Sequence, residues 1–208
     1  MNKHSLFYFN AILFLLFFSL SQNVLGKENL LIFGDSLSSG YGIGIEKSWT
    51  KLLSKKIKDN NSSINIINRS IAGETTAGGL RRLPKLLKIT EPKIVILELG
   101  ANDALRGLPL DRTKQNLSLM IDESKKINSK VLLVGLRIPP NYGKAYSTKF
   151  YDLFGEIADE KEISLLPFMF DGFGADKSFF LEDQIHPNEK AQTIIFKNIW
   201  EMLEPMLK

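Results

Sequence analysis

Five short apolar runs, separated by longer segments of helical periodicity, constrain the fold of this 208-residue chain more than any other feature. The runs are nearly continuous and mostly rich in Ile, Val and Leu, which is typical of strands buried on both faces of a parallel sheet. They cover residues 30–33, 64–67, 94–99, 131–136 and 163–166.

The intervening segments place apolar residues three and four positions apart, which is the spacing of an amphipathic helix. These predicted helices cover residues 49–58, 79–89, 113–127, 146–161 and 188–207. Regular alternation of strand and helix indicates an α/β protein with a five-stranded, mostly parallel sheet covered by helices on both faces, a three-layer α/β/α arrangement.

Residues 1–26 differ from the rest of the chain. Lys3 and His4 precede an apolar run over 6–20, and a short polar segment with small residues ends at Gly26. This order predicts a signal peptide cleaved after Gly26. Fifteen helical residues reach only about 22 Å, less than the roughly 30 Å hydrocarbon core, although an uncleaved anchor is the alternative. Residues 27–208 are then expected to form one domain.

Composition excludes several classes of function. The chain has no cysteine, so disulfides, a Cys nucleophile, Cys-ligated metals and a lipobox are excluded. The net charge is +4, or +3 without the signal, and it is scattered, which gives no support to nucleic-acid binding. It is compatible with a weak, transient contact with anionic membrane surfaces. A nucleotide-binding module is disfavoured because the glycines at 40, 42 and 44 do not complete GxGxxG.

Polar, glycine-bearing segments follow the predicted strands, at the edge where ligands of open parallel sheets bind. The first contains Ser36, within Gly34-Asp35-Ser36-Leu37. A serine held out on a turn after a strand suits a nucleophile, but a serine there is also a common helix N-cap. No GxSxG surrounds it, so it is not the nucleophile elbow of the α/β-hydrolases.

His186 is the only histidine of the predicted mature chain, so it is the only imidazole available as a base for Ser36. Pro187 is expected to occupy the first helical position and to display the ring at the start of a helix. Asp183, three residues earlier, can accept a hydrogen bond from one ring nitrogen and leave the other for the nucleophile. A turn or capping role is the alternative for Asp183.

An acyl-transfer site also needs hydrogen-bond donors for the oxyanion. The N–H groups of Ser36 and Gly73 and the side-chain amide of Asn102 are suitable in type. Taken singly, Gly73 and Asn102 would be read as turn residues.

These segments resemble, in order, the four blocks of the SGNH (GDSL-type) hydrolases: Gly34-Asp35-Ser36-Leu37, Gly73, Gly100-Ala101-Asn102-Asp103 and Asp183-Gln184-Ile185-His186-Pro187. The resemblance covers essentially the whole predicted mature chain and is nearest to the secreted thioesterase, lysophospholipase and arylesterase group. It implies a flavodoxin-like fold, Ser36 as nucleophile, His186 as base and then acid, Asp183 as its orienting partner, and Ser36, Gly73 and Asn102 as the oxyanion hole.

The resemblance further implies a periplasmic enzyme, without metal or cofactor, that hydrolyses acyl esters and thioesters of small molecules, such as fatty acyl-CoA, lysophospholipids and aryl esters. We expect it to be a monomer. The loops with Leu105, Ile138, Pro139 and Tyr142 are expected to line an acyl-chain groove, with plain loop packing as the alternative. A cell-envelope carbohydrate O-acetylesterase and a non-catalytic lipid- or glycan-binding module remain alternative functions.

Overall fold

A five-stranded parallel sheet in the order β2-β1-β3-β4-β5 forms the centre of the molecule. The computed structural model describes residues 28–60 and 63–207; the predicted signal peptide therefore lies outside the described residues. The strands are β1 (Asn29–Gly34), β2 (Asn65–Asn68), β3 (Pro92–Glu98), β4 (Lys130–Val134) and β5 (Ser164–Leu166). All five strands predicted from the sequence are present, with ends shifted by at most two residues.

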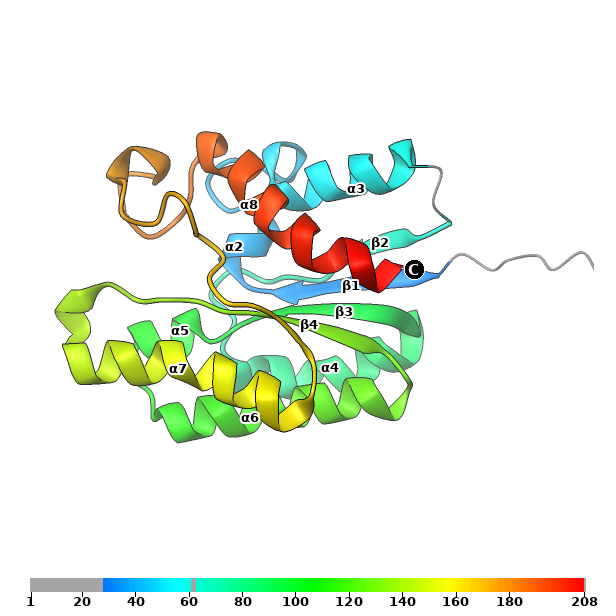
Figure 1. Ribbon diagram of the computed structural model, residues 1–208, viewed down its shortest axis with the longest axis horizontal. Helices are drawn as coiled ribbons and strands as arrows, with labels where there is room; N and C mark the ends of the chain where they lie inside the picture. The colour runs from blue at the N-terminus through cyan, green and yellow to red at the C-terminus, as the bar shows by residue number, and fades with distance from the viewer. Residues whose placement is uncertain (1–27, 61–62, 208) are drawn as a thin grey trace, which may run out of the picture.

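Helices cover both faces of the sheet, as Figure 1 shows. On one face lie α3 (Trp49–Asp59) and α8 (Glu189–Leu203), and on the other lie α4 (Thr76–Thr90), α6 (Leu110–Lys126) and α7 (Lys144–Lys161). The predicted three-layer α/β/α fold is confirmed. None of the helices in the described ranges is both long enough and apolar enough to cross a bilayer.

The central strands explain why the apolar runs are nearly continuous. Residues 30–33 of β1 have no exposed surface, because side chains on alternate faces meet helices above and below the sheet. Strand β3 is also buried from Ile94 to its last residue, Glu98, whose carboxyl group lies inside the core. The two strands pair in register, with Gly34 opposite Glu98.

Two short helices follow these central strands, α2 (Ser36–Ser39) after β1 and α5 (Ala101–Leu105) after β3. The sequence did not predict them, because four or five residues are too few to show helical periodicity. The other unpredicted elements are single 3-10 turns at Ile45–Lys47, Pro140–Tyr142 and Lys177–Phe179.

Side-chain caps set the beginnings of α3, α4 and α8. Ser48 caps α3 by accepting from the N–H of Lys51, and Thr75 caps α4 by accepting from that of Gly78, so α4 begins three residues before the predicted start. The predicted helix 188–207 ends as an α-helix at Leu203 and continues only as a 3-10 turn at Glu204–Leu207.

Candidate active site

Ser36 is the first residue of α2, at the carboxyl end of β1. The N-cap of α2 is Asp35, whose Oδ1 accepts from the N–H of Leu37 at 3.0 Å, so the alternative that Ser36 is itself a helix cap is wrong. The short helix is held from outside: Trp49 Nε1 donates to Leu37 O at 3.0 Å, and Asn68 Nδ2 donates to Ser38 O at 2.8 Å. The Ser36 hydroxyl faces the loop before α8, which carries Asp183 and His186.

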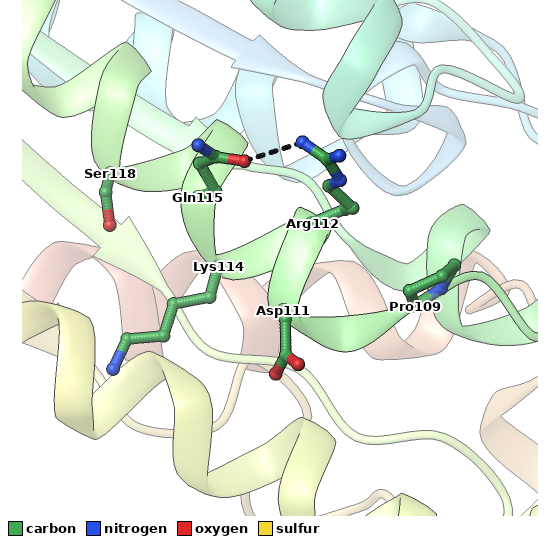
Figure 2. A pocket seen from close by; sticks show the side chains of 6 residues that line it. All are labelled: Pro109, Asp111, Arg112, Lys114, Gln115 and Ser118. Carbon is green, nitrogen blue, oxygen red and sulfur yellow. Dashed lines mark hydrogen bonds between the residues drawn. The ribbon is translucent and has the colours of Figure 1, made fainter.

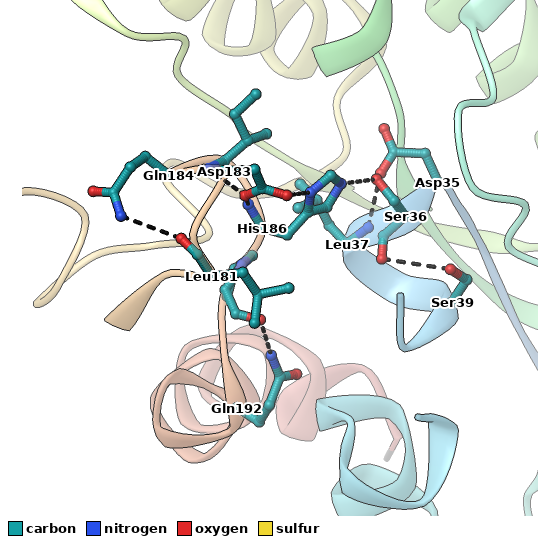
Figure 3. Close-up of polar contacts among 11 residues, drawn as sticks. Asp35, Ser36, Leu37, Ser39, Leu181, Asp183, Gln184, His186 and Gln192 are labelled. Carbon is teal, nitrogen blue, oxygen red and sulfur yellow. Dashed lines mark hydrogen bonds and ion pairs between the residues drawn. The ribbon is translucent and has the colours of Figure 1, made fainter. Parts of the chain in front are cut away.

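That loop brings His186 and Asp183 to Ser36, as Figure 3 shows. Nε2 of His186 lies 2.8 Å from Oγ of Ser36, and Nδ1 lies 2.7 Å from Oδ2 of Asp183. The two ring nitrogens thus bind the two partners expected from the sequence. The imidazole side chain is 18% exposed, and the ring of Tyr41 covers part of it, with ring centroids 4.4 Å apart.

Asp183 builds the turn that presents the histidine. Its Oδ1 accepts from the N–H groups of Ile185 and His186, both at 2.9 Å. Gln184, which follows Asp183 in this turn, has a positive φ of 58°. Burial alone would raise the pKa of Asp183, but the hydrogen bonds from His186 and from the N–H of Ile185 outweigh it and hold the pKa below the usual aspartate value. The carboxylate therefore stays ionised as an acceptor for the ring.

The prediction that Pro187 begins the last helix is wrong. Helix α8 starts at Glu189 and is capped by the side chain of Asn188. Pro187 instead pairs with Phe180 in an isolated antiparallel bridge, and the N–H of Leu181 donates to His186 O at 2.8 Å. The imidazole is held by this strand-like contact and by Asp183, not by a helix terminus.

The three predicted oxyanion donors follow β1, β2 and β3 in the chain, Ser36 in α2, Gly73 in a turn and Asn102 in α5. The N–H of Ser36 is the first of α2 and has no partner inside so short a helix. Gly73 lies in a turn closed by the Glu74 N–H and Ile71 O at 3.1 Å; its φ is 77°. Arg106, just after α5, donates through Nη2 to Gly73 O at 2.9 Å and so ties this turn to the next loop.

Asn102, in α5, reaches toward the nucleophile's turn. Its Nδ2 donates to Oδ2 of Asp35, the residue before Ser36, at 2.8 Å. The amide that the sequence suggested as a third donor is therefore bound through one hydrogen to a buried carboxyl group.

Sequence reasoning assigned no role to two carboxyl groups of the site, Asp35 and Glu98. Glu98 Oε2 accepts from Ser38 Oγ at 2.6 Å and from the N–H of Asp35 at 3.2 Å. Burial, together with the charge of Asp35, raises the pKa of Glu98 well above its usual value. Burial raises the pKa of Asp35 to about 6, although the hydrogen bonds from Leu37 and Asn102 oppose it. The signal in the sequence was a glutamate at the end of an otherwise apolar strand.

The predicted groove residues differ in their accessibility. Ile138 is only 7% exposed and packs in the main core, so it offers little surface to a substrate. Tyr142 is 40% exposed, Pro139 is exposed, and Leu105 is half-buried. The N–H of Tyr142 donates to Pro139 O at 3.3 Å in the turn after β4.

Surface hollows elsewhere are chemically unlike this site. One, of about 600 Å³, lies along α6 and is drawn in Figure 2; its lining consists of Pro109, Asp111, Arg112, Lys114, Gln115 and Ser118. Arg112 Nη1 donates to Gln115 Oε1 at 3.1 Å there, and no histidine is among the residues that line the hollow. Within residues 28–60 and 63–207, no group of three His, Asp or Glu side chains is placed to hold a metal ion.

A parallel α/β sheet whose strand-end loops join Ser, His and Asp by hydrogen bonds defines a serine hydrolase. The chain belongs to the GDSL-like lipase/acylhydrolase family, whose model matches residues 32–194. The sequence resemblance to the SGNH hydrolases is therefore confirmed.

Named relatives agree over most of the chain. An arylesterase of Vibrio mimicus is 43% identical over 177 residues, which cover 85% of this chain and 88% of the relative. Thioesterase 1/protease 1/lysophospholipase L1 of Escherichia coli is 37% identical over 194 residues, covering 93% and 92%. The structure of the psychrotrophic esterase EstA from Pseudoalteromonas sp., inhibited by monoethylphosphonate, superposes with a TM-score of 0.82 at 39% identity, covering 86% of this chain and 98% of that one.

Proposed function

We propose that this chain is a serine esterase and thioesterase that hydrolyses fatty acyl-CoA, lysophospholipid and aryl-ester substrates through an acyl-enzyme on Ser36. The observation that carries the proposal is the continuous series of hydrogen bonds from Ser36 Oγ through both nitrogens of His186 to Asp183. The names of the relatives, an arylesterase and a thioesterase/lysophospholipase, support ester and thioester substrates.

In the first half-reaction, His186 Nε2 takes the proton of Ser36 Oγ as the oxygen attacks the carbonyl carbon of the substrate. The imidazolium is stabilised by Asp183, whose carboxylate accepts from Nδ1–H. The carbonyl oxygen becomes an oxyanion, and the N–H groups of Ser36 and Gly73 and the amide of Asn102 donate to it. His186 then returns the proton to the departing alcohol or thiol, and the acyl group remains on Ser36.

In the second half-reaction, water replaces the leaving group. His186 Nε2 removes a proton from the water as its oxygen attacks the acyl carbon, and the same donors bind the second oxyanion. Collapse of that intermediate breaks the bond to Ser36, which regains its proton from His186, and a carboxylic acid leaves. The mechanism uses neither a metal nor a cofactor.

The acyl chain is proposed to extend over the exposed faces of Pro139, Tyr142 and Leu105, with Ile138 supporting them from the core. The active form is proposed to be a monomer of residues 27–208, released in the periplasm by cleavage after Gly26. A weak, transient contact with membrane surfaces fits lysophospholipid substrates.

The deciding experiment is hydrolysis of p-nitrophenyl esters from acetyl to palmitoyl, and of palmitoyl-CoA, by the wild type and by Ser36→Ala. The wild type should cleave both esters and thioesters, and Ser36→Ala should lose nearly all activity. Full activity in Ser36→Ala would refute the mechanism. Activity confined to acetyl esters would favour the carbohydrate O-acetylesterase, and binding of acyl compounds without turnover would favour a non-catalytic module.

A further inference from the structure

Asp35 is a buried carboxyl group between the nucleophile and the third oxyanion donor. Its two oxygens have different partners: Oδ1 accepts from the N–H of Leu37 at 3.0 Å, and Oδ2 accepts from Nδ2 of Asn102 at 2.8 Å. Its side chain is drawn beside Ser36 in Figure 3. Only 1% of its surface is exposed, so water does not compete for these two hydrogen bonds.

The orientation of a side-chain amide decides whether Asn102 helps or hinders an oxyanion. An amide has an oxygen that accepts and a nitrogen that donates twice, and the two ends have nearly the same shape. If the oxygen stood where the nitrogen stands, its lone pairs would face the developing negative charge. An ionised carboxylate has no proton to donate, so it binds only the nitrogen end of the amide.

We propose that Asp35 is a positioning residue for the reaction: its carboxylate binds one N–H of Asn102 and thereby fixes the amide with its second N–H available to the oxyanion. This inference rests on the proposed function of Ser36, and it assigns to Asp35 a role that acts through Asn102 without contact with the substrate.

The surroundings of Asp35 hold it in place for this task. Glu98 Oε2 accepts from the N–H of Asp35 and from Ser38 Oγ, which binds the turn to β3. The close approach depends on Gly34, because a Cβ there would lie 2.5 Å from Glu98 Oε2. The strand, the turn and α5 are therefore connected through these carboxyl groups.

The groups that face Asp35 determine its ionisation. The hydrogen bonds from Leu37 and Asn102 and the electrostatic effect of His186 lower the pKa of Asp35, and the carboxyl group of Asp103 raises it. Glu98, whose own pKa is raised by burial and by the charge of Asp35, accepts from the N–H of Asp35. Burial dominates and raises the pKa of Asp35 to about 6. Below that pH the protonated carboxyl can donate to the oxygen of Asn102, so the constraint on the amide is lost.

Asp35→Asn tests the proposal with a nearly isosteric change. The oxygen of the new side chain is needed by the N–H of Leu37, so its NH₂ group faces Asn102 and favours the reversed amide. We expect kcat to fall about 100-fold, the size of the loss of one oxyanion donor, while KM changes less than about threefold, because the oxyanion exists only in the transition state.

The double variant with Asn102→Ala separates positioning from structure. If Asp35 acts through Asn102, adding Asp35→Asn to Asn102→Ala lowers kcat no further than about twofold, because the interaction is already absent. Ser124→Ala is the control: it removes a buried hydrogen bond to Met120 O within α6, outside the active site, so it should leave kcat unchanged.

Losses of kcat that multiply in the double variant, or a kcat within about threefold of wild type in Asp35→Asn, would overturn the proposal. The acid side of the profile of log kcat against pH gives a second readout. It should be steeper in the wild type, where Asp35 takes up a proton, than in Asp35→Asn; equal slopes would also overturn it. Loss of activity in Ser36→Ala together with full activity in Asp35→Asn would refute this inference and leave the proposed function standing.

Discussion

Oγ of Ser36 lies 2.8 Å from Nε2 of His186, although 150 positions separate the two residues in the chain. The serine is carried by the strand-end helix α2, and the histidine by an irregular loop held by Asp183 and by the bridge between Phe180 and Pro187. Each half of the site is fixed by its own local contacts. Changes to either half should therefore affect catalysis without unfolding the protein.

Asp183→Asn should lower kcat by about 10³- to 10⁴-fold with little change in KM. The oxygen of the new amide would still accept from the N–H groups of Ile185 and His186, so its NH₂ would face Nδ1 of His186. Nδ1 would then have to accept, and Nε2 would carry the proton and could not act as a base. Steady-state kinetics with p-nitrophenyl butyrate, with the Tm as a check on folding, measure this; a kcat within tenfold of wild type would contradict it.

Gly34→Ala should destabilise the protein by about 1–3 kcal/mol. The added Cβ would lie 2.5 Å from Glu98 Oε2 and 2.8 Å from the main-chain oxygen of Glu98, and backbone cannot move aside easily. Gly155→Ala, within α7, is the control: its Cβ has no heavy atom within 4 Å, so it should stabilise by about 0.5–1 kcal/mol. Urea unfolding of both variants measures the difference, and equal midpoints would count against this account.

Stability should decrease as the pH rises above about 4, because the pKa values of Asp35 and Glu98 are raised by burial. Between the unfolded pKa, near 4, and the folded value, the native state keeps protons that the unfolded chain has released. Each group lowers the free energy of unfolding by at most about 1.4 kcal/mol per pH unit in that range. The lowered pKa of Asp183 has the opposite effect, but only below about pH 4.

Glu98→Gln removes one of these two titrations. Relative to the wild type, the variant should become more stable as the pH rises from 5 to 8. The Tm of both proteins, measured at pH 5 and at pH 8, checks this. A constant difference in Tm between the two proteins from pH 5 to pH 8 would contradict the raised pKa of Glu98.

Tyr142→Ala should lower kcat/KM for long-chain p-nitrophenyl esters several-fold more than for the acetyl ester, because Tyr142 is 40% exposed on the proposed acyl path. Ile138, expected from the sequence to line the groove, is 7% exposed, so enlarging it should change chain-length preference only by displacing its neighbours. If the dependence of kcat/KM on acyl chain length is unchanged in both variants, these loops do not line the acyl-chain groove.

Much of this architecture is readable from the sequence because buried strands and amphipathic helices leave strong periodic signals. The strands, the long helices and the meeting of Ser36 with His186 and Asp183 all follow from such patterns and from the scarcity of histidine. The prediction for Pro187 failed because a proline suits both a helix start and the end of an extended segment, and only the contact with Phe180 decides between them.

The sequence pattern does not predict the roles of Asp35 and Glu98. A buried carboxyl group is recognisable only when its partners are known, and these come from the turn after β1 and from α5. Which partner each oxygen of Asp35 binds is likewise known only from the three-dimensional structure.

The separation of Ser36 from His186 has a consequence during protein synthesis. The ribosome makes the nucleophile and the segments that carry Gly73 and Asn102 long before it makes Asp183 and His186. A nascent chain therefore holds a serine that lacks a proton acceptor, and it has no means to hydrolyse esters in the cell that is producing it. Activity begins only when the loop with Asp183 and His186 has been translated and His186 has reached Ser36.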